Sequence, residues 1–453
     1  MSPSHELAQL SRKTCAFLVV VFVLFNLFAV VRALPVNSQL SENREANRGT
    51  YNRNVYRVFR LAKGQAEQPF FDVKNHGIFF DRNPGLFMFA AELFVRAGAT
   101  TPFPNQLFAI LLWNIGLVLL FLWLLKLFRS ELVAAAGLGF LLTTPFLLFY
   151  SSSIHHEPWC FCFFNLTFYC FVRYLQQDKS RTWLVATCIA YFLLCQSYWF
   201  YYMSAGILIV ALQVRARSFS LRDTLILACV PVLATLTTFL QVAYALDGVD
   251  NALFRMKDIA AARTLDMRIE HSEWYPDRKF VQPYHIHRYP ITVMERIELV
   301  SGYDVTTFGT MLFASAALAG RQVWRRLPWM LLVIFAGMCW HLVMIQHTVI
   351  HRFAGMYGWF MWVLIVAVFV SELQRAVQPS RVRLVAAAFA IPFAIYALQR
   401  EYVPYLTTYL KNAQLIASQP PKPGASEPPK KEKKRETSGK TSADTLSAGD
   451  MKE

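Results

Sequence analysis

The sequence is dominated by long apolar runs that recur from the beginning of the chain almost to its end. An α-helix needs about 20 apolar residues to cross the hydrocarbon core of a bilayer. The eleven runs that suit this role lie at 15–34, 104–125, 132–149, 158–175, 183–197, 203–213, 224–245, 305–320, 328–346, 354–371 and 384–398. A shorter run at 86–97 would only dip into the membrane. The pattern predicts an all-α polytopic membrane protein with about 11 transmembrane helices.

The composition excludes the main soluble classes. Hydrophobic residues make up 55% of the chain and charged residues 16%, with a mean hydropathy of +0.33. A soluble domain carries about a quarter charged residues, so a soluble enzyme or a disordered regulator is excluded. The eight cysteines lie in or beside apolar runs, which predicts no disulfide framework.

The placement of the positive charge predicts the orientation. The chain has a net charge of +16. The short loops 126–131, 173–182, 214–223, 321–327 and 372–383 together hold fourteen Lys or Arg residues. The alternate connections 150–157, 198–202 and 347–353 together hold one, Arg352. Because cytoplasmic loops carry the excess of Lys and Arg, we expect the first set, with residues 1–14, in the cytoplasm.

This orientation sends two long polar loops, 35–85 and 246–304, to the extracytoplasmic side of a membrane domain at 15–400. The first loop contains an amphipathic pattern at 51–63 that predicts an interfacial helix. The second opens with a helical stretch at 251–268. After the membrane domain we expect an interfacial segment at 401–417 and a disordered tail at 418–453.

Titratable residues gather at the extracytoplasmic ends of the predicted spans. The candidate catalytic carboxylates in the first long loop are Glu42, Glu45, Asp72 and Asp81. The candidate phosphate-binding residues are Arg82, His155, His156, His347, His351 and Arg352. A carboxylate there would deprotonate an acceptor hydroxyl, and Arg and His would neutralise the phosphate of a lipid-linked donor. The predicted cytoplasmic loops contain neither a glycine-rich nucleotide-binding loop nor an Asp-x-Asp pair. A binding site for a soluble nucleotide sugar is therefore not evident.

Each of these residues also has a purely structural interpretation. Loop carboxylates are often solvated or cap a turn. His155, His156 and Glu157 could simply start a helix that has Pro158 in its first turn. His347 and His351 have the i, i+4 spacing of zinc ligands but also suit plain packing, and Arg352 could reach the interface. The aromatic run 198–202 predicts an interfacial belt, with sugar stacking as the alternative.

Two segments resemble a known family. Residues 80–86, Phe-Asp-Arg-Asn-Pro-Gly-Leu, resemble the Phe-Asp-x-His-Pro-Pro-Leu element of dolichyl-phosphate-mannose-protein mannosyltransferases. Residues 346–353, Gln-His-Thr-Val-Ile-His-Arg-Phe, resemble a histidine-rich element of the same family. That family has the GT-C fold, which lipid-A aminoarabinose transferases share. The order of spans and loops over 15–400 is also similar.

By this resemblance Asp81 takes the place of the Asp in the first luminal loop. The chain departs from the family in lacking a paired Asp-Glu soon after the first span, and Glu42 or Glu45 would stand in for it. The resemblance implies an inverting membrane glycosyltransferase that moves a sugar from a polyprenyl-phosphate carrier to a lipid, glycan or protein acceptor.

A secondary transporter or flippase for a lipid-linked or anionic substrate is the alternative function. The expected partners are the donor, the acceptor and the lipid bilayer, with no nucleic acid. We assign no metal ligand and leave a divalent cation open as a cofactor. Loops without sequons or cysteines favour a bacterial inner membrane, with the endoplasmic reticulum membrane as the alternative.

Overall fold

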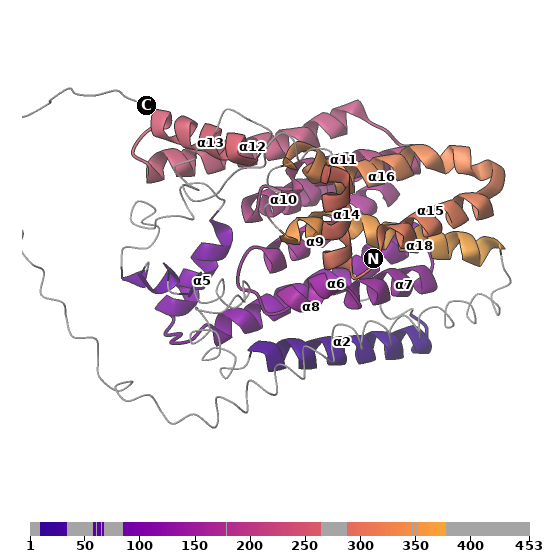
Figure 1. The fold of residues 1–453 in the computed structure, drawn as a ribbon, viewed down its shortest axis with the longest axis horizontal. Helices are drawn as coiled ribbons and strands as arrows, with labels where there is room; N and C mark the ends of the chain where they lie inside the picture. Colours follow the sequence, from indigo (N-terminus) through magenta and orange to yellow (C-terminus); the bar gives the residue numbers. More distant parts are fainter. Residues whose placement is uncertain are drawn as a thin grey trace, which may run out of the picture.

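The computed structural model describes residues 10–33, parts of 58–67, 85–177, 179–263, 288–345, residue 348 and residues 352–376. These ranges are helical and contain no strand (Figure 1). The helices are α2 (Arg12–Ala33), α5 (Leu86–Arg96), α6 (Phe103–Phe128), α7 (Glu131–Leu142), α8 (Pro145–Tyr150), α9 (Glu157–Gln176), α10 (Arg181–Ser197), α11 (Tyr201–Ala216), α12 (Leu221–Ala245), α13 (Val249–Arg263), α14 (Tyr289–Ser301), α15 (Val305–Ala319), α16 (Val323–Val343) and α18 (Trp359–Ala376), with short 3₁₀ helices η4 (Gly320–Gln322) and η5 (Arg352–Gly358).

Ten of the eleven predicted spans fall on described residues, except for residues 34 and 346, and the described part of each is mainly helical. Within the described part of the chain, five helical segments are long and apolar enough to cross a membrane, so the chain is an α-helical membrane protein. These segments are Arg12–Val31, Phe103–Phe128, Leu221–Ala245, Val305–Val343 and Ala354–Ala376. That all eleven apolar runs cross the membrane stays a prediction. The run 384–398, the segment 401–417 and the tail 418–453 lie outside the described residues.

The bundle has two chemically different ends. At one end the start of α6 meets the connection before α9, because Gln106 donates to the carbonyl of Ser152. At the other end Gln176 of α9 donates to the carbonyl of Lys126 of α6. We call the first the histidine end, after His155, and the second the arginine end. Figure 1 shows α5 at the histidine end, on the left, and the hairpin between α15 and α16 on the right.

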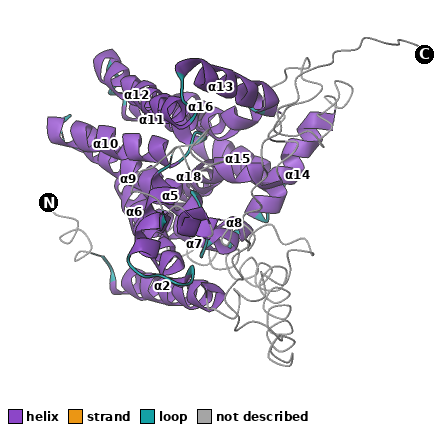
Figure 2. Ribbon diagram, turned by 90° about the vertical axis from the view of Figure 1, so that its left-hand side faces the viewer, coloured by secondary structure: helices purple, strands orange, loops and turns teal. Residues whose placement is uncertain are grey.

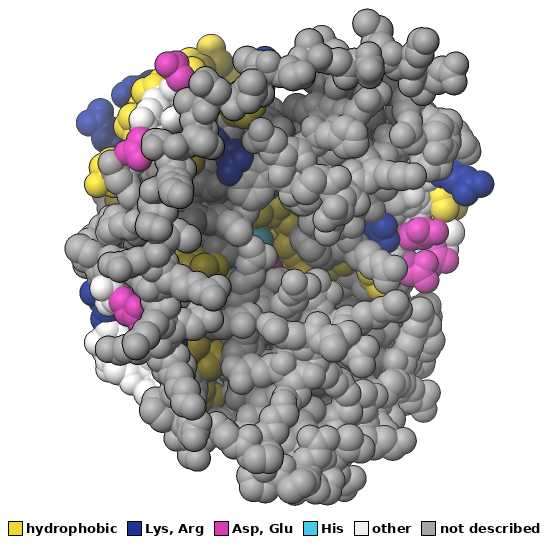
Figure 3. Space-filling model, turned by 60° about the vertical axis from the view of Figure 1, so that its left-hand side comes forward, with side chains coloured by type: hydrophobic (Ala, Val, Ile, Leu, Met, Phe, Trp, Pro, Cys, Tyr) yellow, Lys and Arg dark blue, Asp and Glu magenta, His cyan; other side chains and the backbone are white. Residues whose placement is uncertain are grey.

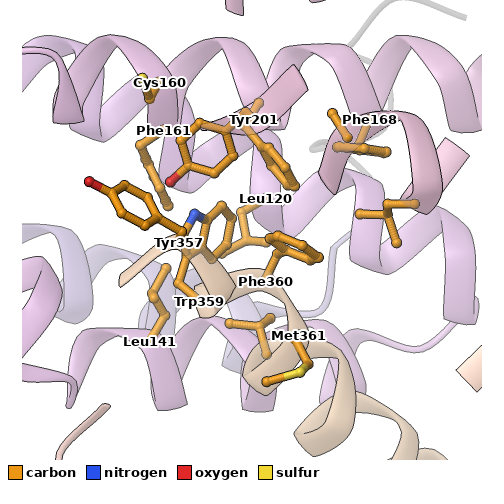
Figure 4. Close-up of a cluster of buried hydrophobic side chains, with 14 of the residues drawn as sticks. Leu120, Leu141, Cys160, Phe161, Phe168, Tyr201, Tyr357, Trp359, Phe360 and Met361 are labelled. Carbon is orange, nitrogen blue, oxygen red and sulfur yellow. The ribbon is translucent and has the colours of Figure 1, made fainter. Parts of the chain in front are cut away.

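Helix α18 occupies the centre of the bundle. It packs against α7, α15 and α16, and 89% of its most apolar window is buried. By contrast, α2 and α12 lie at the periphery, with 17% and 28% of their windows buried (Figure 2). Aromatic side chains fill the space around the start of α18, where Tyr357, Trp359 and Phe360 meet Phe161 and Tyr201 (Figure 4).

Local chemistry explains where the helices begin and end. Helix α6 ends at Arg129 in a left-handed conformation, and the next residue, Ser130, caps α7 by accepting from the backbone of Val133. The predicted span 132–149 is not one helix, because Thr144 and Pro145 begin a separate helix, α8. Proline suits the first turn of a helix but interrupts a continuous one.

The predicted helices of the two long loops are partly described. Val58, Phe59 and Ala62, predicted on one apolar face, are all buried. The predicted helical stretch 251–268 is observed as α13, Val249–Arg263, and its last residues lie outside the described part. The short run 86–97 forms α5, whose 11 residues span only about 16 Å, too little to cross a bilayer.

Candidate functional site

The connection between α8 and α9 is held rigidly at the histidine end. Ser151, Ser152 and Ser153 are all buried there, although they are polar. The indole of Trp113 donates to the carbonyl of Tyr150 at 2.9 Å, and the side-chain amide of Gln106 donates to the carbonyl of Ser152 at 3.3 Å. These bonds from α6 satisfy buried carbonyls and fix the path of the chain towards α9.

His155, His156 and Glu157 follow this connection and form a compact cluster. Glu157 Oε1 lies 3.5 Å from His155 Nδ1 and 3.8 Å from His156 Nε2. One ligand atom from each residue lies within 4.8 Å of the other two. The side chains of His156 and Glu157 are 4% and 7% exposed, and that of His155 is 15% exposed. Figure 3 views this end of the molecule, and a histidine side chain is visible deep in it among apolar groups.

Ser153 orients the cluster. Its hydroxyl donates to Glu157 Oε2 at 3.1 Å and accepts from the backbone N–H of His155 at 3.3 Å. One carboxylate oxygen of Glu157 is therefore held by Ser153, and the other faces the two imidazoles.

The cluster also begins α9, as predicted from Pro158, which lies in the first turn. His156 stands at the N-cap position, but no side chain makes a capping hydrogen bond there. The prediction that these residues start a helix is therefore confirmed. It does not explain why the side chains of His156 and Glu157 are buried.

An aromatic wall covers the cluster. The ring of Tyr198 stacks on that of His156, with centroids 3.7 Å apart and an interplanar angle of 6°. Phe87 of α5 lies 4.8 Å from His155, measured between ring centroids. The predicted interfacial belt at 198–202 is wrong in this respect, because Phe200 and Tyr201 are buried in the core.

The same wall connects the cluster with η5. Phe200 lies 5.9 Å from His156 and 3.7 Å from Tyr357 of η5, between ring centroids. Thr348 precedes η5 by four residues, and its hydroxyl forms a hydrogen bond with His341 Nδ1 at 3.2 Å. His156 and Tyr357 of η5 are therefore linked through the buried ring of Phe200.

Burial lowers the pKa of His156 to about 3, although the carboxylate of Glu157 opposes this shift. The imidazole is therefore neutral at physiological pH and keeps a free lone pair. Neither ring nitrogen of His156 has a hydrogen-bond partner among the described residues. Because a buried polar group without a partner costs free energy, such a ring is suited to bind a ligand.

Most of the other predicted site residues cannot be located. Glu42, Glu45, Asp72, Asp81, Arg82, His347 and His351 lie outside the described residues, as does the side chain of Arg352. Of the predicted set, the structure brings His155 and His156 together, with Glu157 beside them.

Three further residues at this end were not predicted as site residues. They are Ser153, Tyr198 and Asn105, the last of which is 5% exposed with both amide atoms unpartnered in the described part of the chain. The run Ser151-Ser152-Ser153, separated from the two histidines only by Ile154, was the available signal for Ser153. Nothing in the sequence pairs Tyr198 with His156, since they come from different connections.

The arginine end has a different character. Glu372 pairs with Arg326 and, at 3.5 Å, with Arg375. Arg215 lies between two aromatic rings, 4.5 Å from the centroid of Phe128 and 4.6 Å from that of Trp329. A cavity of about 880 Å³ also lies at this end, and its charged lining residues are Lys126, Arg129, Glu131 and Arg215.

Comparison with known proteins adds no identification. No family model matches the chain. No curated protein matches it either. The class defined by the fold is an α-helical membrane protein with a buried His-His-Glu cluster at one end of its bundle.

Proposed function

We propose that the chain is a membrane glycosyltransferase of the GT-C type. It transfers a sugar from a polyprenyl-phosphate carrier to an acceptor at the histidine end, which faces away from the cytoplasm. The observation that carries this proposal is the buried cluster of His155, His156 and Glu157 at the membrane end that the charge distribution assigns to the extracytoplasmic side. A lipid-linked donor presents its phosphate at the membrane surface, while its isoprenoid tail stays in the bilayer.

The proposed chemistry is a single displacement with inversion. One carboxylate among Glu42, Glu45, Asp72 and Asp81 removes the proton from the acceptor hydroxyl as its oxygen attacks the anomeric carbon. The carrier phosphate then leaves as its bond to that carbon breaks. Cationic and histidine side chains from residues 82, 155–156 and 347–352 stabilise the charge that develops on the phosphate. The aromatic link from Phe200 to Tyr357 supports a common site for the last two groups.

A transfer assay tests this function. Purified full-length protein in nanodiscs is given a panel of radiolabelled polyprenyl-phosphate sugars and candidate acceptors, and release of carrier phosphate is measured. We expect release with one sugar. Asp81→Asn and the double change Glu42→Gln, Glu45→Gln should each be compared with wild type. Loss of the base should lower kcat about 10²- to 10⁴-fold.

The matched control is Glu298→Gln, a carboxylate exposed on α14 that has no proposed role. It should retain full activity. Turnover at the wild-type rate in both carboxylate variants would refute the assignment of the base. Absence of release with every donor, from protein shown to be folded, would refute the enzyme class and favour the transporter or flippase alternative, which uptake of a labelled lipid-linked sugar into proteoliposomes would detect.

A further inference from the structure

We propose that His155, His156 and Glu157 bind a divalent transition-metal ion, with Zn²⁺ preferred. The site is defined by these three side chains alone, so it does not depend on the glycosyltransferase proposal. Within the described ranges, this is the one group of three or more His, Cys, Asp or Glu residues whose ligand atoms converge in this way.

The geometry of the cluster is close to that of a metal centre. Metal bonds of about 2.1 Å in a tetrahedral site separate neighbouring ligand atoms by about 3.4 Å. Glu157 Oε1 already lies 3.5 Å from one imidazole nitrogen and 3.8 Å from the other. The largest separation among the three ligand atoms is within 4.8 Å, so a small rotation of one imidazole would bring all three within bonding distance of one ion.

Two neighbouring side chains, Ser153 and Tyr198, hold the proposed ligands in position. Metal centres commonly have such residues, which contact the ligands but not the metal. Ser153 donates to Glu157 Oε2, which leaves Oε1 directed at the two imidazoles. The stacked ring of Tyr198 fixes the plane of the His156 imidazole. Such supporting contacts orient metal ligands and tune their affinity.

A metal also accounts for the unpartnered groups. Both ring nitrogens of His156 lack hydrogen-bond partners among the described residues, although the residue is 3% exposed. The neighbouring carboxylate of Glu157 is buried as well. An ion bound between them would give His156 a partner and neutralise a buried negative charge, and both changes lower the free energy of the folded state.

The ligand set decides the kind of metal. Two imidazoles and one carboxylate suit Zn²⁺ and other late first-row ions, whereas Mg²⁺ prefers oxygen ligands and retains water. Three protein ligands leave one position of a tetrahedral site for water or an oxygen of a bound anion. This is the pattern of an open metal centre rather than a closed structural one.

Metal analysis of the intact protein tests the proposal. The full chain is purified through a tag without histidines, stripped with a chelator, and titrated with Zn²⁺ or Mg²⁺. We expect one tightly bound Zn²⁺ per chain that is lost on stripping and regained on titration, and no comparable binding of Mg²⁺. X-ray absorption of the zinc-loaded protein should show two imidazoles and a carboxylate at about 2.0–2.1 Å.

Variants locate the ion. His155→Ala, His156→Ala and Glu157→Gln should each weaken Zn²⁺ binding on the order of 100-fold, and Ser153→Ala about 10-fold. His341→Gln, a buried histidine outside the cluster, should bind as wild type does. If a ligand variant fails to fold, the X-ray absorption spectrum of zinc-loaded wild type and the Zn²⁺ titration of Ser153→Ala still test the proposal. A zinc shell without two imidazoles, unchanged affinity in the folded ligand variants, or no zinc binding by wild type would overturn the proposal.

Discussion

At the scale of single residues, Gly355 has the least room for a side chain among the glycines of the described residues. A Cβ atom built there would lie 2.6 Å from the carbonyl carbon of Arg296 and closer still to the carbonyl oxygen. Helix α14 and η5 therefore touch backbone to backbone at this point. Because the obstacle is a main chain and not the end of a flexible side chain, it cannot move aside at low cost.

Gly355→Ala should therefore destabilise the protein by about 2–3 kcal/mol, the upper part of the range for overpacked sites. The matched control is Gly309→Ala in α15, where a Cβ would meet nothing within 4 Å. That change should stabilise its helix by up to about 1 kcal/mol, since alanine is the better helix former. Thermal unfolding in one detergent measures both. Equal melting temperatures for the two variants would show that α14 and η5 do not meet at Gly355.

At the scale of elements, α2 is attached to α7 through one carboxylate. Glu131 accepts hydrogen bonds from the hydroxyl of Ser11 at 2.6 Å, from its backbone N–H at 3.1 Å and from the hydroxyl of Thr14 at 2.5 Å. Partial burial raises the pKa of Glu131, but these three hydrogen bonds outweigh burial, so the pKa lies below its usual value of 4.5. Since α2 is otherwise a peripheral helix, this contact fixes its position at the arginine end.

The lowered pKa of Glu131 predicts a pH-dependent attachment. A carboxylate whose pKa is lower in the folded state adds stability that is present above its unfolded pKa. That stability is lost as the pH falls through the folded pKa, which lies below 4.5. Wild type should therefore melt at a higher temperature than Glu131→Gln at pH 7, and the gap should narrow as the pH falls below 4.5. A gap of constant size from pH 7 to pH 3 would contradict the prediction.

At the scale of the whole molecule, the two ends of the bundle carry different polar side chains. Arg215, Arg326 and Arg375 gather at the arginine end, where Glu372 pairs with two of them. His155 and His156 lie at the opposite end of the bundle, where Gln106 of α6 bonds to Ser152, whereas Gln176 and Lys126 meet at the arginine end. By the positive-inside rule we expect the arginine end to lie in the cytoplasm and the histidine end to face out of it.

Thiol labelling checks this orientation. Thr100→Cys, in the connection between α5 and α6, should react with a membrane-impermeant reagent in vesicles sealed with the extracytoplasmic side outward. Arg222→Cys, in the first turn of α12, should react only after permeabilisation. The parent should have Cys15 and Cys229, the two exposed cysteines among the eight, replaced by alanine. Labelling of both positions, or the reverse pattern, would refute the topology.

Much of the helical layout could be predicted from the sequence because a bilayer-length apolar run is a strong local signal. The break at Thr144 and Pro145 was missed, since an apolar run does not reveal where its backbone turns. Within the site, the adjacent residues His155 and His156 were identified from their chemistry. The stacking of Tyr198 on His156 could not be predicted, because it depends on how two separate connections fold together.

The central position of α18 has a consequence for how the protein is made. The chain emerges from the ribosome in order, and among the five described segments that are apolar enough to cross a membrane the most buried one is the last to be synthesised. Until then the faces of α7, α15 and α16 that α18 covers in the folded protein lack this partner. Assembly of the bundle is therefore completed after most of the chain has already been inserted, and a nascent chain interrupted before residue 359 leaves an unfilled groove through its centre for quality-control proteases to recognise.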